Sequence, residues 1–239
     1  MGSEVAVAFR PIMQPHFKIF GPVHLAILGS VPIVAAILAW IQRSVQGRKG
    51  LRLGLALVLL LNAVVWHAYM WMRGWLRFPD SLPLELCDAT LCLAFIALTT
   101  LNATVFDLAY YGALAGTSMA LLTPDLWEAF PSLSTVEFFV IHGLAVASVL
   151  YLVWSGEARP RPGSVWRAML GVNVYAAAVG TFNYIFKTNY MYLRSKPASR
   201  SLLDYLGPWP WYIASSEVVA LLLFGLLYLP FWRRADSSR

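Results

Sequence analysis

Seven apolar stretches, each about 20 residues long, run through this chain of 239 residues. A helix of that length crosses a hydrocarbon core of roughly 30 Å, so each stretch is predicted to be a transmembrane helix. The turn at Leu101-Asn102-Ala103 is so short that the third and fourth helices must form an antiparallel hairpin. The sequence therefore predicts an all-α polytopic membrane protein, a single seven-helix bundle domain over residues 1–239 with spans at approximately 20–42, 51–73, 82–101, 104–123, 135–155, 166–187 and 209–232.

The composition supports this class of protein. Hydrophobic residues make up 59% of the chain and charged residues 13%, which is about half of the roughly 25% found in soluble domains. A net charge of +6 is also seen in proteins that bind nucleic acid. Here, however, the basic residues lie in short loops between apolar stretches and form no basic stripe with base-stacking aromatic residues. We therefore expect no nucleic-acid partner.

Basic residues also predict the orientation of the bundle, because loops rich in Lys and Arg stay on the cytoplasmic side of a membrane. They gather between the first and second spans, between the fifth and sixth spans, and in the tail: Arg43, Arg48, Lys49 and Arg52; Arg159, Arg161 and Arg167; Arg233, Arg234 and Arg239. An odd number of spans then places the N-terminus outside and the C-terminus in the cytoplasm. We expect a multi-pass protein of the cell membrane.

Four ionisable side chains are predicted to lie at a similar depth, near the outer ends of four different spans. They are the thiol of Cys87 and the imidazoles of His24, His67 and His142. Ionisable groups inside a span are costly and usually face the bundle interior or a water-filled cavity. Several of them at one depth therefore indicate a functional site, although His24 follows a helix-starting Gly-Pro pair and is expected to make local hydrogen bonds.

A thiol becomes a useful nucleophile when a nearby histidine takes its proton, since burial alone disfavours the thiolate. His142 is the predicted partner of Cys87, because Gly143 beside it leaves room for a substrate and because its span starts on the same side. The alternative is that Cys87 is a small buried thiol and that His142 donates to a carbonyl on the next helix. His67 lies among aromatic residues and could orient His142 or hold a substrate carbonyl.

Three further alternatives concern the class of protein. Three histidines and a cysteine could hold zinc, but the sequence contains no H-x-x-x-H, H-x-x-E-H or C-x-x-C pattern, so neither a metal nor another cofactor is predicted. A transporter could relay protons through Glu137, Asp107 and Glu217, although we find no matched broken helices in two halves of the chain. A non-catalytic membrane scaffold is the third alternative.

The motifs around these residues resemble those of the YwaF-like bacterial integral membrane proteins. That family is related to a eukaryotic family of membrane acyltransferases that remodels ether phospholipids, and the resemblance spans most of the chain. Bacterial relatives often have a histidine where this chain has Glu85. The motifs are Leu82–Cys87, Leu121–Leu126 with Phe130–Ser132, Phe138–Gly143, Asn189–Pro197 and Asp204–Pro210.

The resemblance implies that Cys87 is a nucleophile and that it works with His142 on fatty acyl esters from within the bilayer. On this basis we expect an intramembrane lipid acyltransferase or acyl hydrolase in a bacterial cytoplasmic membrane. Its expected partner is a phospholipid or lysophospholipid. The expected substrate contacts are His67, oxyanion donors from Asn183 and Tyr184, and phosphate contacts from Arg194 and Lys196.

Overall fold

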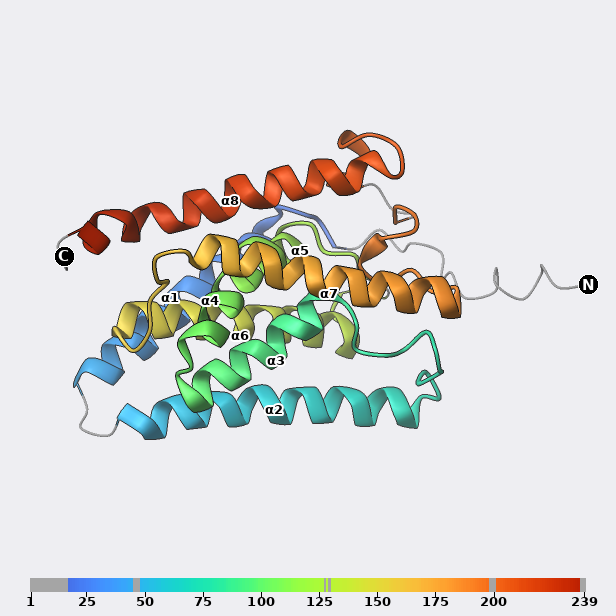
Figure 1. Cartoon of the computed structure of the whole chain (residues 1–239). Coiled ribbons are helices and arrows are strands. Elements are labelled where there is room, and N and C mark those ends of the chain that lie inside the picture. Colours follow the sequence, from blue (N-terminus) through green and yellow to red (C-terminus); the bar gives the residue numbers. More distant parts are fainter. Residues whose placement is uncertain (1–16, 45–47, 127, 129, 198–200, 237–239) are drawn as a thin grey trace, which may run out of the picture.

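The chain folds into a bundle of helices that run roughly side by side (Figure 1). The computed structural model describes residues 17–44, 48–126, 128, 130–197 and 201–236, and within these ranges all regular structure is helical. Residues 1–16 and the predicted cytoplasmic residue Arg239 lie outside the described part. The helices are α1 (Pro22–Ser44), α2 (Arg48–Met72), α3 (Leu86–Thr100), α4 (Ala103–Tyr111), the π-helical segment η2 (Gly112–Thr117), α5 (Ser118–Leu122), α6 (Leu133–Ser155), α7 (Ser164–Phe186), the 3-10 turns η3 (Tyr190–Tyr192) and η4 (Leu202–Tyr205), and α8 (Trp211–Asp236).

The predicted spans agree closely with these helices, and the fourth span is built from α4, η2 and α5 in succession. Within the described ranges, six helices are long and apolar enough to cross a membrane. The exception is α3, which has 15 residues and therefore a length of about 22 Å, less than the roughly 30 Å of a hydrocarbon core. The polytopic, all-helical class is confirmed, whereas the seventh crossing and the orientation stay predictions.

The hairpin between α3 and α4 forms as predicted, and its residues show why. α3 ends at Thr100, and the next residue, Leu101, adopts the left-handed conformation with φ 55°. Asn102 then caps α4, because its side-chain oxygen accepts hydrogen bonds from the backbone N–H groups of Thr104 and Val105. The two helices consequently pack against each other along their length.

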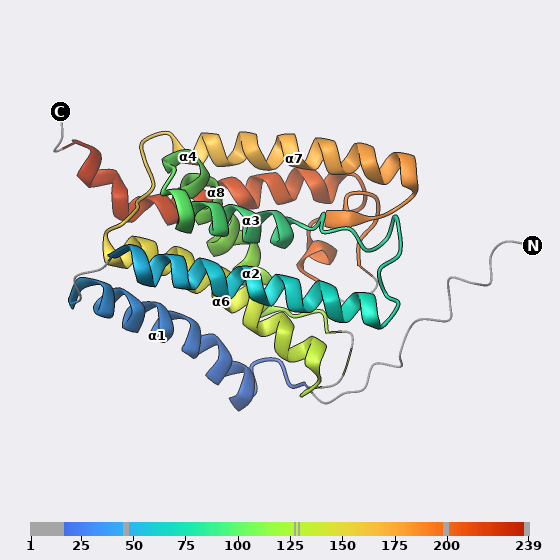
Figure 2. The ribbon, with the colours of Figure 1, turned by 90° about the horizontal axis from the view of Figure 1, so that it is seen from below.

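The start of α3 differs from its predicted place, since the helix begins at Leu86 rather than near residue 82. Pro83 disfavours a helical conformation at the residue before it, and Glu85 is the N-cap, with its backbone N–H donating to the Asp88 carboxylate over 3.0 Å. In Figure 2, α3 begins part-way along α2, and the connecting residues 73–85 run back from the end of α2 toward the bundle. The first turn of α3 therefore lies within the bundle.

The π-helical segment η2 packs directly on the first turns of α3. Two small residues allow this close approach. A Cβ atom added at Gly112 would lie 2.6 Å from the Thr90 Oγ1 atom, and one at Gly116 would lie 3.2 Å from the Leu86 Cδ2 atom. π-helical turns are rare and occur frequently at functional sites. This one packs against the start of α3, where Cys87 lies.

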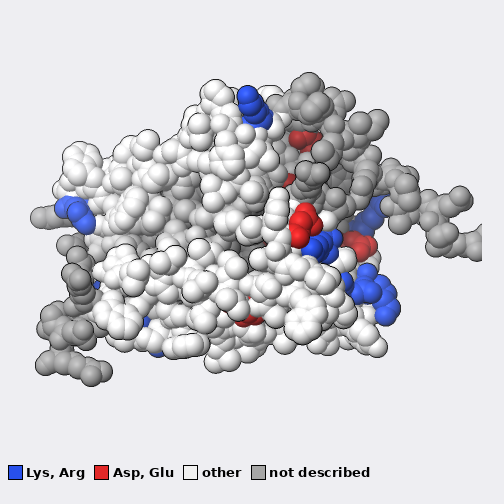
Figure 3. Space-filling model, turned by 90° about the horizontal axis from the view of Figure 1, so that it is seen from above, with Lys and Arg blue, Asp and Glu red and all other residues white. Residues whose placement is uncertain are grey.

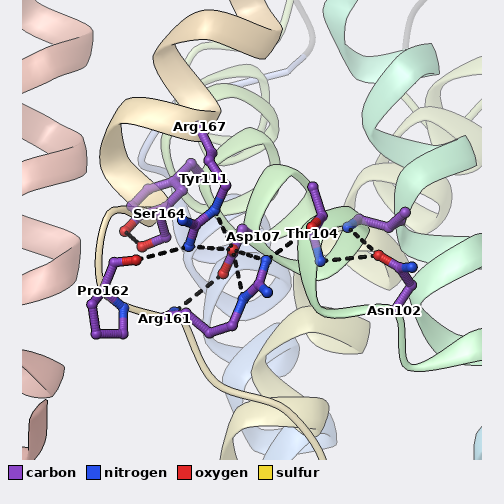
Figure 4. A network of polar contacts seen from close by, with 9 residues as sticks. Asn102, Thr104, Asp107, Tyr111, Arg161, Pro162, Ser164 and Arg167 are labelled. Atoms are coloured by element: carbon purple, nitrogen blue, oxygen red, sulfur yellow. Dashed lines mark hydrogen bonds and ion pairs between the residues drawn. The ribbon is translucent and has the colours of Figure 1, made fainter.

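A network of charged side chains closes the end of the bundle at which α7 begins (Figure 4). Asp107 on α4 is fully buried and accepts hydrogen bonds from Arg161 in the α6–α7 loop and from Arg167 on α7, with N–O distances of 2.8 Å and 2.9 Å. Beside it, the Tyr111 and Ser164 hydroxyls lie 2.8 Å apart. The network holds the α6–α7 loop against α4. The two arginines compensate the buried charge of Asp107 through ion pairs and hydrogen bonds.

The surface of the bundle is mostly uncharged, as a lipid-facing surface must be. Figure 3 shows a face whose Lys, Arg, Asp and Glu side chains gather mainly toward one end of the molecule. Large apolar side chains such as Trp71, Trp166 and Leu222 are exposed along the helices. Charged side chains inside a hydrocarbon layer are costly, so this distribution agrees with a protein whose long helices cross a membrane.

Candidate functional site

Cys87 lies in the first turn of α3, part-way along the bundle, and its side chain is partly buried. The thiol interacts electrostatically with the carboxyl groups of Asp88 and Glu85 and lies within interaction range of the Thr117 hydroxyl on η2. The positive end of a helix dipole favours a thiolate at this position, but two neighbouring carboxylates oppose a further negative charge. A base is therefore needed to remove the thiol proton when the sulfur reacts.

Asp88 connects Cys87 to other ionisable groups. It interacts electrostatically with His67 on α2 and with Glu137 on α6. His67 itself has its Nδ1 atom 2.8 Å from the Ala63 carbonyl oxygen. We call this set the α3 start cluster; it consists of Glu85, Cys87, Asp88, His67, Thr117 and Glu137.

His142 lies on α6, which packs against α3. Its Nδ1 atom is 2.7 Å from the Phe138 carbonyl oxygen, and its ring stacks on that of Phe138 at 4.1 Å between centroids. A carbonyl can only accept, so Nδ1 carries the proton and Nε2 presents a lone pair, the form a general base requires. Among the described residues no hydrogen bond joins His142 to Cys87, so the predicted pairing of the two stays a prediction.

His24 is fully buried and uses both ring nitrogens. Its Nδ1 atom accepts a hydrogen bond from the Phe20 backbone N–H over 2.9 Å, and its Nε2 atom lies 2.7 Å from the Leu121 carbonyl oxygen. The first bond fixes the tautomer, so Nε2 carries the proton and donates to Leu121. His24 therefore ties the start of α1 to the end of α5.

Residues 188–196, which we call the cover segment, are held near the start of α3. The Tyr190 hydroxyl donates to the Pro79 carbonyl and accepts from the Leu82 backbone N–H, each over 2.8 Å. Glu85 accepts from the Met191 backbone N–H over 2.9 Å. Burial raises the pKa of Tyr190, so its hydroxyl keeps the proton that it donates. The residues before α3 and the cover segment thus form one hydrogen-bonded unit.

The backbone of the cover segment is unusual at Met191 and Tyr192, which adopt left-handed conformations with φ values of 55° and 52°. Such conformations are costly for residues other than glycine and are kept where the surrounding structure imposes them, often at functional sites. Burial raises the pKa of Tyr192, and the negative charges of Asp125 and Glu85 raise it further. The Tyr212 hydroxyl on α8 also donates to the Tyr192 carbonyl. α8 thereby supports the strained turn.

The predicted substrate contacts on α7 have different surroundings. Asn183 is fully buried, and its amide bonds the Thr188 hydroxyl and both the N–H and the carbonyl of Tyr190. It positions the cover segment. Tyr184 is 74% exposed, and the Lys187 ammonium lies 4.8 Å from its ring centroid. A direct contact of either residue with a substrate stays a prediction.

The two predicted phosphate contacts lie in the cover segment. Arg194 is exposed and donates to the Thr188 carbonyl over 3.3 Å. Lys196 lies 3.9 Å from an Asp204 carboxylate oxygen and above the Tyr212 ring. Of the two, Arg194 has its guanidinium group more available to a headgroup, because Lys196 already has an acidic partner.

The three carboxylates considered for proton relay are dispersed. Asp107 belongs to the arginine network at one end of the bundle, and Glu137 belongs to the α3 start cluster. Glu217 on α8 accepts a hydrogen bond from the Asn173 amide over 2.8 Å. Across the part of the chain that the structure describes, no three His, Cys, Asp or Glu side chains gather in a way that could hold a metal ion.

Replacing Tyr190 with Phe is expected to loosen the loop before α3. The change removes the hydroxyl that satisfies the Pro79 carbonyl and the Leu82 N–H, and a lost partner for such groups costs about 1–3 kcal/mol. Amide hydrogen exchange across residues 79–85 is expected to become about tenfold faster or more. Tyr205→Phe, at a side chain that is 86% exposed, is the matched control. Equal exchange in the two variants would show that the Tyr190 hydroxyl does not hold this loop.

Comparison with known proteins gives one match. The sequence profile of the TMEM164 family matches residues 19–228. This range includes α1 to α7, the cover segment and most of α8. No curated protein sequence and no solved structure shows a significant match.

Proposed function

We propose that this chain, which belongs to the TMEM164 family, is an intramembrane enzyme. It would transfer or hydrolyse lipid acyl groups through Cys87. The observation that carries the proposal is the placement of Cys87. It lies in the first turn of a helix that begins within the bundle, among polar groups from three helices and beneath the cover segment. Six helices in the described part of the chain are long and apolar enough to cross a membrane, and in that setting lipid esters would reach this site laterally.

The proposed reaction has two steps. In the first, His142 Nε2 takes the proton of the Cys87 thiol, the sulfur attacks the ester carbonyl, and an S–C bond forms as the C–O bond breaks. The leaving lysolipid alkoxide takes the proton back from His142, and a thioester remains on Cys87. In the second step, water or the hydroxyl of another lysolipid attacks the thioester, again with His142 as base, and the thiol is restored.

The charges around the sulfur support the proposed role of a histidine base. Glu85 and Asp88 both interact with Cys87, and a thiolate beside two carboxylates is disfavoured unless a base accepts the proton as the sulfur reacts. Nδ1 of His142 is held by the Phe138 carbonyl, which leaves Nε2 as the basic atom. Catalytic hydrogen bonds in ligand-free enzymes are often long and tighten when a substrate binds.

An amphiphilic substrate fits this arrangement. Its acyl chains would lie against the exposed apolar helices, and its headgroup would meet the polar segments at the end of the bundle where α7 finishes. Arg194 in the cover segment is the proposed phosphate contact. His67, which interacts with Asp88, is proposed to contact the polar part of the lipid near Cys87.

Intact-protein mass spectrometry after incubation with phospholipid tests the proposal. The parent protein is expected to gain the mass of one acyl group, Cys92→Ser is expected to gain it as well, and Cys87→Ser is expected to gain none. Cys92 is the matched control because it is the second cysteine of α3 and is exposed. Acylation that persists in Cys87→Ser, or no acylation of any of the three, would overturn the proposal and favour the transporter or scaffold alternative.

A further inference from the structure

We propose that Thr117 is a positioning residue for Cys87, and that its hydroxyl donates a hydrogen bond to the sulfur when Cys87 becomes a thiolate. The catalytic role of this contact rests on the proposed function, but the contact itself can be tested without any lipid. Thr117 is the last residue of η2, is 1% exposed, and has its hydroxyl within interaction range of the Cys87 thiol. A hydroxyl that donates to a thiolate stabilises it relative to the thiol.

The Thr117 hydroxyl is unusual because it is buried without a hydrogen-bond partner. Hydroxyls of Ser and Thr in apolar helices normally bond a carbonyl of the preceding turn. Three neighbours in the same hairpin do so, since Thr90, Thr99 and Thr100 each donate to a carbonyl three or four residues earlier. A buried unsatisfied hydroxyl costs about 1–3 kcal/mol and calls for an explanation.

The π-helical turn explains why Thr117 lacks the usual partner. The carbonyl four residues before it belongs to Ala113, which already accepts from the Ser118 backbone N–H and from the Ser118 hydroxyl over 3.1 Å. A carbonyl oxygen has two lone pairs, so both are in use. The hydroxyl of Thr117 is consequently left for a partner outside its own helix.

The packing of η2 on α3 brings that outside partner close. Gly112 and Gly116 allow η2 to approach the first turns of α3, and a Cβ atom at Gly116 would already lie 3.2 Å from the side chain of Leu86, the residue before Cys87. In an ordinary α-helical turn the Ala113 carbonyl would accept from the N–H of residue 117 and would be available to its hydroxyl. The two glycines therefore allow the close approach, and the π-helical turn leaves the Thr117 hydroxyl as an unpaired donor.

Several ionisable groups share the surroundings of Cys87 and must be considered in any pH-dependent measurement. They come from the segments that pack near the start of α3: Glu85 and Asp88 before and on α3, His67 on α2, Glu137 on α6, Tyr175 on α7 and Tyr192 in the cover segment. The proposed base, His142 on α6, is a further titratable group. Because Thr117 does not titrate, its replacement changes the Cys87 profile without removing any of these groups. A difference between the pH profiles of two Thr117 variants can therefore be assigned to the residue at position 117.

The test is the rate at which iodoacetamide alkylates Cys87, followed by intact mass as a function of pH in a Cys92→Ser background without lipid. Thr117→Val removes the hydroxyl at nearly constant shape and is expected to slow alkylation about tenfold at neutral pH and to move the midpoint of the profile about one pH unit upward. Thr117→Ser keeps the donor and is expected to follow the parent. Thr99→Val is the matched control, because its hydroxyl bonds carbonyls of its own helix rather than the Ala113 carbonyl.

A Thr117→Val profile that superimposes on the parent profile would overturn the inference. If Thr117→Val does not fold, Thr117→Ala takes its place with the same expected shift, and thermal unfolding identifies the folded variants. The outcome is separable from that of the proposed function. A shifted Thr117→Val profile, with no acyl adduct on the parent protein, would support the contact and contradict the proposed acyl chemistry. An acyl adduct on the parent protein, with an unchanged Thr117→Val profile, would contradict the contact alone.

Discussion

His142→Ala is expected to slow lysolipid release from phospholipid by about a hundredfold to ten-thousandfold, the range that a general base contributes. The proton of Cys87 must be removed beside two carboxylates, and without the Nε2 base the thiol has to lose it to water. The measurement is the initial rate of lysolipid formation by purified protein in lipid nanodiscs. Added imidazole is expected to restore part of the rate in His142→Ala, because it can occupy the space that the side chain leaves.

His67→Ala is the informative comparison for this prediction. His67 interacts with Asp88, and its Nδ1 atom is held by its own helix in the same way as that of His142. If it contacts only the polar part of the lipid, its removal is expected to raise KM more than it lowers kcat. A larger loss of kcat in His67→Ala than in His142→Ala would assign the base to His67 and would contradict the proposed role of His142.

Asp107→Ala is expected to have the largest effect on stability of any substitution considered. Removing one partner of a buried ionic group typically costs about 3–5 kcal/mol, and the lower end applies here because Arg161 and Arg167 are each partly exposed to solvent. The α6–α7 loop would lose its bonds to Asp107 at the same time and would keep the bond from Arg161 to the Thr104 hydroxyl on α4. The measurement is thermal unfolding in detergent, in which the midpoint is expected to fall by several degrees.

Asp204→Ala is the control for Asp107→Ala. Its carboxylate is more exposed and lies 3.9 Å from Lys196, and exposed ion pairs of this kind contribute about 0–1 kcal/mol. Equal unfolding midpoints in the two variants would show that the arginine network does not stabilise the bundle. Asp107→Asn is expected to fall between the parent and Asp107→Ala, since an amide keeps one acceptor for the two arginines but loses the charge.

The sequence predicted the helices well because apolar length is a direct consequence of bilayer thickness. The hairpin at Leu101 followed from the shortness of its turn and is confirmed. The start of α3 was predicted four residues early, because the apolar run begins before Pro83 whereas the helix begins after it. The π-helical segment could not be predicted, since Gly112 and Gly116 alone do not distinguish a π turn from an ordinary close helix contact.

The candidate site was harder to predict than the fold, because hydropathy gives the depth of a residue but not the direction in which its side chain points. The expected local hydrogen bond of His24 is present, since its Nδ1 atom accepts from the Phe20 N–H, whereas its contact with the Leu121 carbonyl on α5 could not be predicted. A substrate contact of Asn183 stays a prediction, and hydropathy did not indicate that its amide also holds the cover segment. Thr117 carried no signal in the sequence, since a threonine in an apolar helix normally bonds its own backbone.

The short length of α3 has a consequence for the surrounding lipid. A hydrophobic segment shorter than the hydrocarbon layer is accommodated by local thinning of the bilayer. With 15 residues, α3 would draw the adjacent leaflet inward on the side where Cys92 and Ile96 are exposed. A glycerol ester linkage, which sits just below its headgroup, would then be depressed toward the level at which α3 begins, and the substrate would travel a shorter distance from the bulk membrane to the sulfur.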